Sequence, residues 1–280
     1  MIVIFFLLLG NSMNVQALGA EHNNTGEKKA VWFSYLDFGI LKDNDEGSFR
    51  VNVNSIYQNL IDQGLNTIIV HVRSFSDAIY PSAIYPWAEF ITSSPEGLDY
   101  DPLKIMIEMA HEKNIKFEAW INPYRVSTYS SKTKQIKNIN YQCSFLELLN
   151  NPGNSIIEYD NVGETCLILN PADEGARKLV LEGVKEIIQN YDVDGIHFDD
   201  YFYVDQAFPF VNPEIRCQNV NNLVMEVYNL IKTSGKEITF GISPAGNIQN
   251  CLDMGADVKT WLSEEGYIDY IMPQILVLNT

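Results

Sequence analysis

The sequence has few basic residues and few cysteines, and it lacks the compact motifs that mark several common functions. Its 280 residues include 19 Lys and Arg against 36 Asp and Glu, which gives a formal net charge of -17 at pH 7. Nucleic acids and anionic membrane surfaces repel so acidic a protein, so neither is an expected partner. The acidity itself needs no explanation beyond solubility.

The four cysteines show no C-x-x-C spacing of the kind that zinc and redox sites use. In an oxidising compartment Cys143 could pair with Cys166, and Cys217 with Cys251. It is equally expected that the four cysteines are free, partly buried thiols. The oligomeric state is left open by the sequence.

Three catalytic or cofactor motifs are also absent. Without a G-x-S-x-G elbow a serine triad is not expected, and without a glycine-rich loop after the first strand a Rossmann nucleotide site is not expected. No H-E-x-x-H pair is present, so a metal-dependent hydrolase stays a weaker alternative, with His71, Glu118, His197 and Asp199 as its only ligand set. No cofactor is predicted.

Long hydrophobic runs are missing after the N-terminus. Residues 1–20 resemble a secretory signal peptide, with an apolar run over 2–10 and a small-residue cleavage pattern at 15–17, although no Lys or Arg precedes the run. That run is short for a membrane span of roughly 20 residues. Residues 21–29 form a polar leader. We expect a secreted, periplasmic or surface-held protein, with no membrane span beyond an uncleaved signal.

Residues 30–280 alternate short strand-like segments with periodic helical ones. Strands are predicted at 31–37, 67–72, 116–122, 193–200, 239–243 and 267–274, and helices at 50–63, 101–113, 172–190, 220–234 and 257–265. This order predicts an α/β fold with a parallel sheet covered by helices, and long loops favour a (β/α)8 TIM barrel. A full barrel needs eight units in roughly 250 residues. Six already consume the chain, so a barrel truncated after about six units is expected. Residues 123–171 are predicted to be irregular.

Strand alternation predicts which side chains face the barrel interior, since successive residues point to opposite faces. Four strands place polar or aromatic residues inward at the same end: His71 and Arg73; Glu118, Trp120 and Asn122; His197, Asp199 and Tyr201; and Tyr270, Met272 and Gln274. Barrel enzymes build their sites at the C-terminal ends of the strands. A polar cleft lined with aromatic rings suits a carbohydrate.

Glycoside hydrolysis needs a carboxylic acid that protonates the leaving oxygen and usually a second carboxylate. Asp199 is the first candidate. Asp200 should point the other way and is the second candidate because strand ends often twist. Glu118 has the right orientation for the partner carboxylate, and Asp77 follows the second strand; either could instead pair with an arginine. A non-catalytic carbohydrate-binding barrel is the alternative reading of the same cleft.

The sequence also resembles a known family through seven ordered blocks. These are residues 31–37 (VWFSYLD), 70–73 with 77–82 (VHVR, DAIYPS), 119–125 (AWINPYR), 169–171 (LNP), 194–203 (DGIHFDDYFY), 242–246 (ISPAG) and 269–275 (DYIMPQI). They are similar to the glycosyl hydrolase-like 10 family over residues 28 to 276.

The resemblance implies an exported bacterial TIM-barrel glycosidase that acts on a cell-wall or related polysaccharide, including peptidoglycan glycan strands stripped of their peptides. It places Asp199 and Asp200 on motif positions. The substrate-binding candidates within the blocks are Arg73, Asp77, Tyr80, Trp120, Asn122, Tyr124, Arg125, His197, Tyr201, Tyr203 and Gln274.

Overall fold

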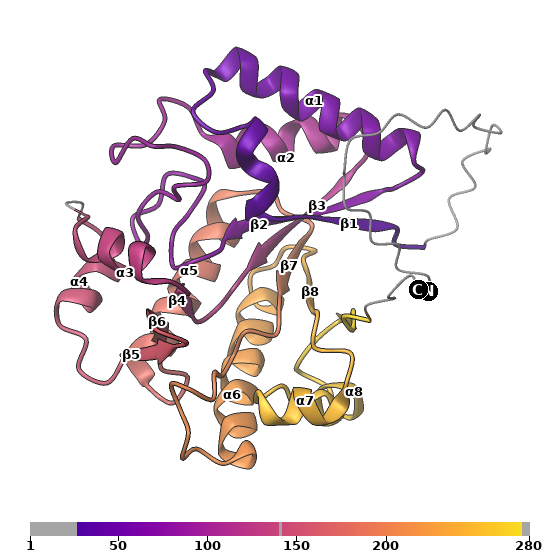
Figure 1. Ribbon diagram of the computed structural model, residues 1–280. Helices are drawn as coiled ribbons and strands as arrows, with labels where there is room; N and C mark the ends of the chain where they lie inside the picture. The colour runs from indigo at the N-terminus through magenta and orange to yellow at the C-terminus, as the bar shows by residue number, and fades with distance from the viewer. Residues whose placement is uncertain (1–26, 140–141, 276–280) are drawn as a thin grey trace, which may run out of the picture.

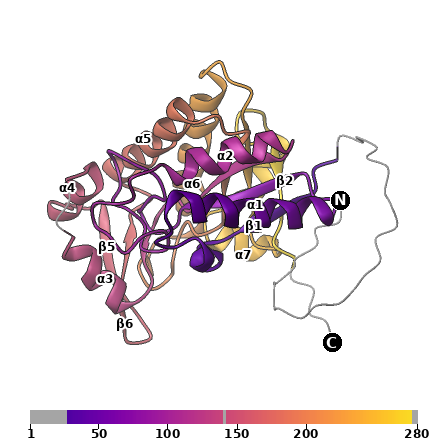
Figure 2. The ribbon, with the colours of Figure 1, turned by 90° about the horizontal axis from the view of Figure 1, so that it is seen from above.

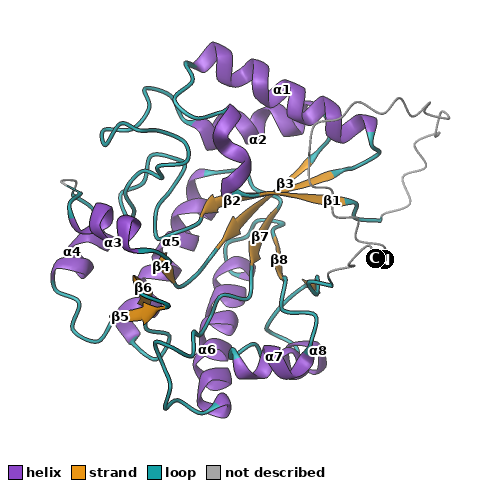
Figure 3. Cartoon of the chain, viewed as in Figure 1, coloured by secondary structure: helices purple, strands orange, loops and turns teal. Residues whose placement is uncertain are grey.

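A computed structural model describes residues 27–139 and 142–275. Its main sheet is six-stranded and entirely parallel, in the order β1-β2-β3-β7-β8-β9. The sheet curls as a half-barrel (Figures 1 and 3) and comprises β1 (Ala30–Phe33), β2 (Thr67–Arg73), β3 (Lys116–Ile121), β7 (Gly195–Phe198), β8 (Thr239–Ile242) and β9 (Tyr270–Ile271). The six predicted strands and the α/β barrel-type fold are confirmed, except that the first strand ends at Phe33 and a 3-10 helix, η1 (Tyr35–Ile40), follows it. The predicted signal peptide, and the polar leader up to residue 26, lie outside the described residues.

Helices cover the outer face of the sheet, with α1 and α2 side by side next to β1–β3 (Figures 1 and 2). The covering helices are α1 (Glu46–Asp62), α2 (Pro102–Glu112), α5 (Glu174–Asn190), α6 (Pro213–Lys232), α7 (Ile248–Asp253) and α8 (Val258–Ser263). Each follows an Asp or Asn whose side chain accepts hydrogen bonds from the first-turn N–H groups. These caps satisfy donors that have no partner inside a helix. None of the helices in the described ranges could span a membrane.

A second, three-stranded antiparallel sheet corrects the prediction that residues 123–171 are irregular. It has the order β4-β6-β5, with β4 (Arg125–Ser127), β5 (Ile156–Asn161) and β6 (Glu164–Leu169). It lies with α3 (Ser130–Lys137) and α4 (Ser144–Asn150) at one side of the molecule (Figures 1 and 2). The β5–β6 turn uses Val162 and Gly163, both at positive φ. A valine there hid the turn, because Asn-Gly is the usual signal.

A β-bulge near the end of β2 reverses one predicted orientation. His71 pairs with Trp120 of β3, but Arg73 rather than Val72 pairs with Ile121. The extra residue shifts the alternation by one position. Arg73 therefore lies on the face of Ile121, which packs against the helices, and not in the barrel interior.

The barrel interior below the C-terminal ends holds a polar cluster around Glu118. This carboxylate is 1% exposed and accepts hydrogen bonds from Lys28, at 2.5 Å, and from the hydroxyl of Tyr270. The Tyr270 hydroxyl also contacts Nδ1 of His197 at 2.9 Å. Tyr270 reaches across β8 over Gly241, where a Cβ would lie 2.0 Å from its ring. The cluster thus ties β3, β7 and β9 together.

All four cysteines are buried and free. Of the two alternatives that the sequence leaves open, the structure shows reduced thiols.

Candidate active site

Asp199 follows the end of β7 and is the centre of a hydrogen-bonded cluster. Its carboxylate is 5% exposed. Oδ2 accepts a hydrogen bond of 2.7 Å from the side-chain amide of Asn122 and one of 3.4 Å from Nη2 of Arg125. The backbone N–H of Arg125 donates in turn to Oδ1 of Asn122 at 3.3 Å. The residues after β3 therefore hold the carboxylate that follows β7, as predicted from the parallel arrangement of these strands.

Burial raises the pKa of Asp199 to about 6, because removing a carboxylate from water disfavours its charged form. The guanidinium of Arg125 opposes this shift and the negative charge of Asp200 adds to it. A carboxyl group that titrates near pH 6 can both give and take a proton at neutral pH. This is the property that acid–base chemistry requires.

Asp200 lies at the same end of the sheet. Gln274, after β9, donates from its side-chain amide to Oδ1 of Asp200 at 3.1 Å and to the carbonyl of Ser243 at 2.8 Å. Burial raises the pKa of Asp200 as well. Alternation predicted that Asp200 points away from Asp199, but β7 ends at Phe198, so the strand rule no longer applies to it. The two carboxyl groups interact electrostatically.

Aromatic residues lie at the same end of the sheet as Asp199, and Trp120 interacts with its carboxyl group. Trp120 is partly exposed and stacks on His71, with ring centroids 3.7 Å apart and nearly parallel planes. The hydroxyl of Tyr201 contacts that of Tyr159 at 3.0 Å, and the Arg125 guanidinium lies 4.7 Å from the Tyr201 ring centroid. Tyr159 belongs to the second sheet and was missed by the sequence analysis, because no local pattern connects β5 with β7.

Two predicted residues lie deeper in the barrel interior. His197 and Glu118 face the barrel interior, as predicted, but Glu118 pairs with Gly195, four residues before Asp199. At about 3.3 Å per residue this is roughly 13 Å along the strand. The structure therefore does not bring Glu118 together with Asp199. Burial lowers the pKa of His197 to about 3, so its imidazole is neutral.

Four predicted substrate-binding residues lie behind the sheet instead of in the cleft. All four are fully buried: Arg73, Tyr80, Tyr124 and Tyr203. Tyr124 packs edge-on against Phe202. Arg73 is reversed by the β2 bulge, and the three tyrosines belong to loops, where strand alternation does not determine orientation.

Asp77 has a structural role in the loop after β2. Its carboxylate accepts hydrogen bonds from the backbone N–H groups of Ser74 and Phe75 and forms an ion pair with the buried Lys132 at 3.3 Å. These contacts satisfy both oxygens. Its carboxylate is thus engaged by the loop and by Lys132.

No group of three or more His, Cys, Asp or Glu side chains in the described part of the chain is arranged to hold a metal ion. Within the described ranges, both ring nitrogens of His71, Nε2 of His197 and Nε of Arg125 lack a hydrogen-bond partner. Water or a ligand could satisfy these groups.

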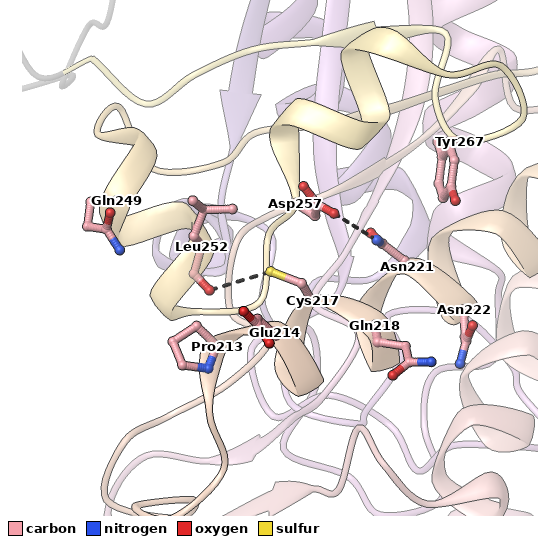
Figure 4. Close-up of a pocket in the computed structure, with 10 residues that line it drawn as sticks. All are labelled: Pro213, Glu214, Cys217, Gln218, Asn221, Asn222, Gln249, Leu252, Asp257 and Tyr267. Atoms are coloured by element: carbon pink, nitrogen blue, oxygen red, sulfur yellow. Dashed lines mark hydrogen bonds between the residues drawn. The ribbon is translucent and has the colours of Figure 1, made fainter.

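A separate pocket of about 530 Å³ lies on the outside of the fold, between α6, α7 and the segments that flank α8 (Figure 4). Its lining includes Gln218, Asn222, Leu252 and Tyr267, and none of its ten residues is a predicted site residue. The candidate active site is therefore defined by its hydrogen-bonded carboxylates and not by this pocket.

The curled parallel sheet is a barrel-type glycosidase fold. The carboxyl groups of Asp199 and Asp200 and several aromatic rings lie at the C-terminal ends of its strands. The chain belongs to the glycosyl hydrolase-like 10 family, which it matches over residues 27–279. This confirms the resemblance found in the sequence.

Two curated relatives are similar over much of the chain. The glycosyl hydrolase YngK of Bacillus subtilis (strain 168) is 30% identical over 96% of this chain and 58% of its own length. The glycosyl hydrolase DigH of Escherichia coli (strain K12) is 30% identical over 76% of this chain and 54% of its own length. The chain thus spans somewhat more than half the length of the curated relatives it matches.

Solved structures with the same fold are more distant in sequence. The PgaB (BpsB) glycoside hydrolase domain from Bordetella bronchiseptica superimposes with a TM-score of 0.58 at 12% identity, covering 88% of this chain and 73% of that one. A cycloisomaltooligosaccharide glucanotransferase from Paenibacillus sp. gives 0.57 at 12% identity, covering 90% and 34%. These similarities show the barrel-type fold alone.

Proposed function

We propose that this protein is an exported glycoside hydrolase that cleaves O-glycosidic bonds of a bacterial cell-wall or related polysaccharide. The observation that carries the proposal is the buried Asp199, whose pKa is raised to about 6 at the C-terminal end of β7. Membership of the glycosyl hydrolase-like 10 family and the names of the two relatives support it.

In the proposed reaction, protonated Asp199 donates its proton to the glycosidic oxygen as the bond to the anomeric carbon breaks. Asn122 and Arg125 hold the carboxyl group in place and stabilise the carboxylate that forms. Asp200 is the second carboxyl group at the same end of the sheet and our candidate for the partner carboxylate, which acts as the nucleophile or as the base that activates water. A water molecule supplies the hydroxyl group that ends on the anomeric carbon, and its proton restores the acid. Trp120 and Tyr201 provide rings on which sugar faces can stack.

The proposed substrate class is a neutral or N-acetylated glycan, with peptide-free peptidoglycan strands as the first example to test. Support comes from the net charge of -17, which disfavours polyanionic substrates, and from the family resemblance. Export rests on the predicted signal peptide.

The decisive experiment compares the full-length protein with its Asp199→Asn variant on purified peptide-free glycan strands, measuring new reducing ends. Loss of a positioned acid–base group costs about 10²–10⁴-fold in rate, so the folded variant should release almost no product. The exposed Asp99→Asn is the matched control and should retain full activity. An active, folded Asp199→Ala variant would show that Asp199 is not the acid, and loss of activity with a chelator would favour a metal-dependent hydrolase.

A non-catalytic carbohydrate-binding barrel is the second candidate. The observation in its favour is that Glu118 pairs with Gly195 deeper in the barrel and that Asp77 is held by Lys132, which leaves Asp200 as the candidate partner carboxylate. Calorimetry with the same glycan distinguishes the two functions: binding without any release of reducing ends by the full-length protein would favour the binding role.

A further inference from the structure

Arg73 is a buried cation for which the described chain provides no carboxylate partner. Its side chain is 0% exposed, and no acid lies within ion-pair distance in residues 27–139 or 142–275. Arginine stays protonated in proteins, so an uncompensated buried guanidinium is costly. The hydrogen bonds that the Arg73 guanidinium does make therefore call for an explanation.

The guanidinium hydrogen-bonds to two loops, and one of these loops connects it to helix α5. Nη1 donates to the hydroxyl of Tyr85 at 2.8 Å, and this hydroxyl donates to the carbonyl of Leu179 in α5 at 2.9 Å. The charge also lies 4.4 Å from the centroid of the Tyr85 ring. Nη2 donates to the carbonyl of Pro123 at 3.2 Å. The hydrogen-bond acceptors of the guanidinium are thus neutral oxygen atoms, and an aromatic ring face lies beside it.

Pro123 directly follows Asn122, so Arg73 binds the turn that holds the active-site donors. The carbonyl of Arg73 also accepts the backbone N–H of Asn122 at 2.9 Å. Arg73 thus bridges both sides of the Asn122–Pro123 peptide link, through its backbone and its side chain. On the other side of the sheet the amide of Asn122 and the guanidinium of Arg125 meet the carboxylate of Asp199.

Gly183 of α5 leaves the space that Arg73 occupies. A Cβ at Gly183 would lie 2.5 Å from Nη1 of Arg73 and 2.6 Å from the Tyr85 ring. Glycine inside a helix is destabilising relative to alanine, so its presence here agrees with a requirement for close approach of the guanidinium.

We propose that Arg73 is a positioning residue that acts from behind the sheet, through the carbonyl of Pro123, to hold Asn122 and Arg125 on the carboxylate of Asp199. Only the expected loss of activity rests on the proposed function. The hydrogen bonds that connect Arg73 to Asn122 and Pro123 do not depend on the substrate. Gly183 and Tyr85 complete the arrangement by fixing the guanidinium.

The test uses the full-length chain with Arg73→Met, Arg73→Lys and Gly183→Ala, and the exposed Lys185→Ala on the same helix as control. The first readout is the carboxyl 13C titration of Asp199, assigned by its disappearance in Asp199→Asn. Weaker donors destabilise the carboxylate, so its titration midpoint should move upward in Arg73→Met and in Gly183→Ala. It should move less in Arg73→Lys, and not at all in Lys185→Ala.

The second readout is glycan cleavage. A misplacement of about 1 Å at the reacting centre costs on the order of 10²-fold in rate, so kcat should fall by that order in Arg73→Met with KM little changed. An unshifted Asp199 titration in folded Arg73→Met and Gly183→Ala would overturn the proposal. Absence of cleavage by the wild type would instead overturn the proposed function, and the titration would still test Arg73.

Discussion

Replacing Asp199 by asparagine should change how the stability of the protein depends on pH. Asp199 has a pKa of about 6 in the folded protein against an ordinary value of 3.8. The folded state therefore binds this proton more tightly than the unfolded state does. The resulting stabilisation is present at low pH and is lost as the pH rises through about 6.

The size of the effect follows from the linkage relation. When the pH falls from about 8 to about 4.5, a group with these two pKa values raises the free energy of unfolding by about 2 kcal/mol. Asparagine does not titrate, so Asp199→Asn lacks this contribution. Its amide would face the backbone N–H of Tyr201, which donates to Oδ1 of Asp199 at 3.4 Å. That cost is the same at both pH values and cancels in the difference.

Urea unfolding of wild type and variant at both pH values measures this difference. On acidification, the wild type should gain about 2 kcal/mol of unfolding free energy relative to Asp199→Asn. Asp99→Asn, at an exposed site, serves as control and should follow the wild type. Parallel pH dependence in wild type and Asp199→Asn would refute the argument that burial controls this carboxyl group, and a difference of opposite sign would mean that Asn122 and Arg125 outweigh burial.

Three further predictions concern the scaffold. Glu118→Gln leaves the ammonium of Lys28 without its anionic partner. It should therefore lower the free energy of unfolding, measured in urea, by about 3 kcal/mol. An unchanged value would contradict the structural role of Glu118. Gly241→Ala should lower the free energy of unfolding by about 1–3 kcal/mol, because the new methyl group overlaps the Tyr270 ring. The double variant with Tyr270→Ala should lack this overlap, and thermal melts measure the difference. The four thiols should react with a thiol reagent slowly in the native protein and completely in denaturant; fewer than four under non-reducing denaturation would indicate disulfides.

Much of the fold follows from local sequence patterns. The six parallel strands and the main helices were predicted because apolar periodicity and capping residues act within a few positions along the chain. The same locality explains the failures. The β4-β6-β5 sheet uses a Val-Gly turn instead of the usual Asn-Gly, and its strands pair across loops of unequal length.

The candidate site was predicted in part for the same reason. Asn122, Asp199 and Gln274 each follow a strand of one parallel sheet, so their approach at one end is a consequence of strand order. Arg73 shows where the rule stops. A bulge is a property of the pairing between β2 and β3, and only the paired structure reveals that Arg73 faces α5.

Local sequence patterns were enough to predict the alternation of strands and helices and the end of the sheet at which the carboxyl groups lie. The folded chain was needed to see that Lys28 and Tyr270 hold Glu118 deep in the barrel and that burial raises the pKa of Asp199 to about 6. The physical reason is that hydrophobic periodicity is encoded over a few residues. Desolvation and ion pairing depend on distant segments, such as Arg125 from β4, that meet only in the folded chain.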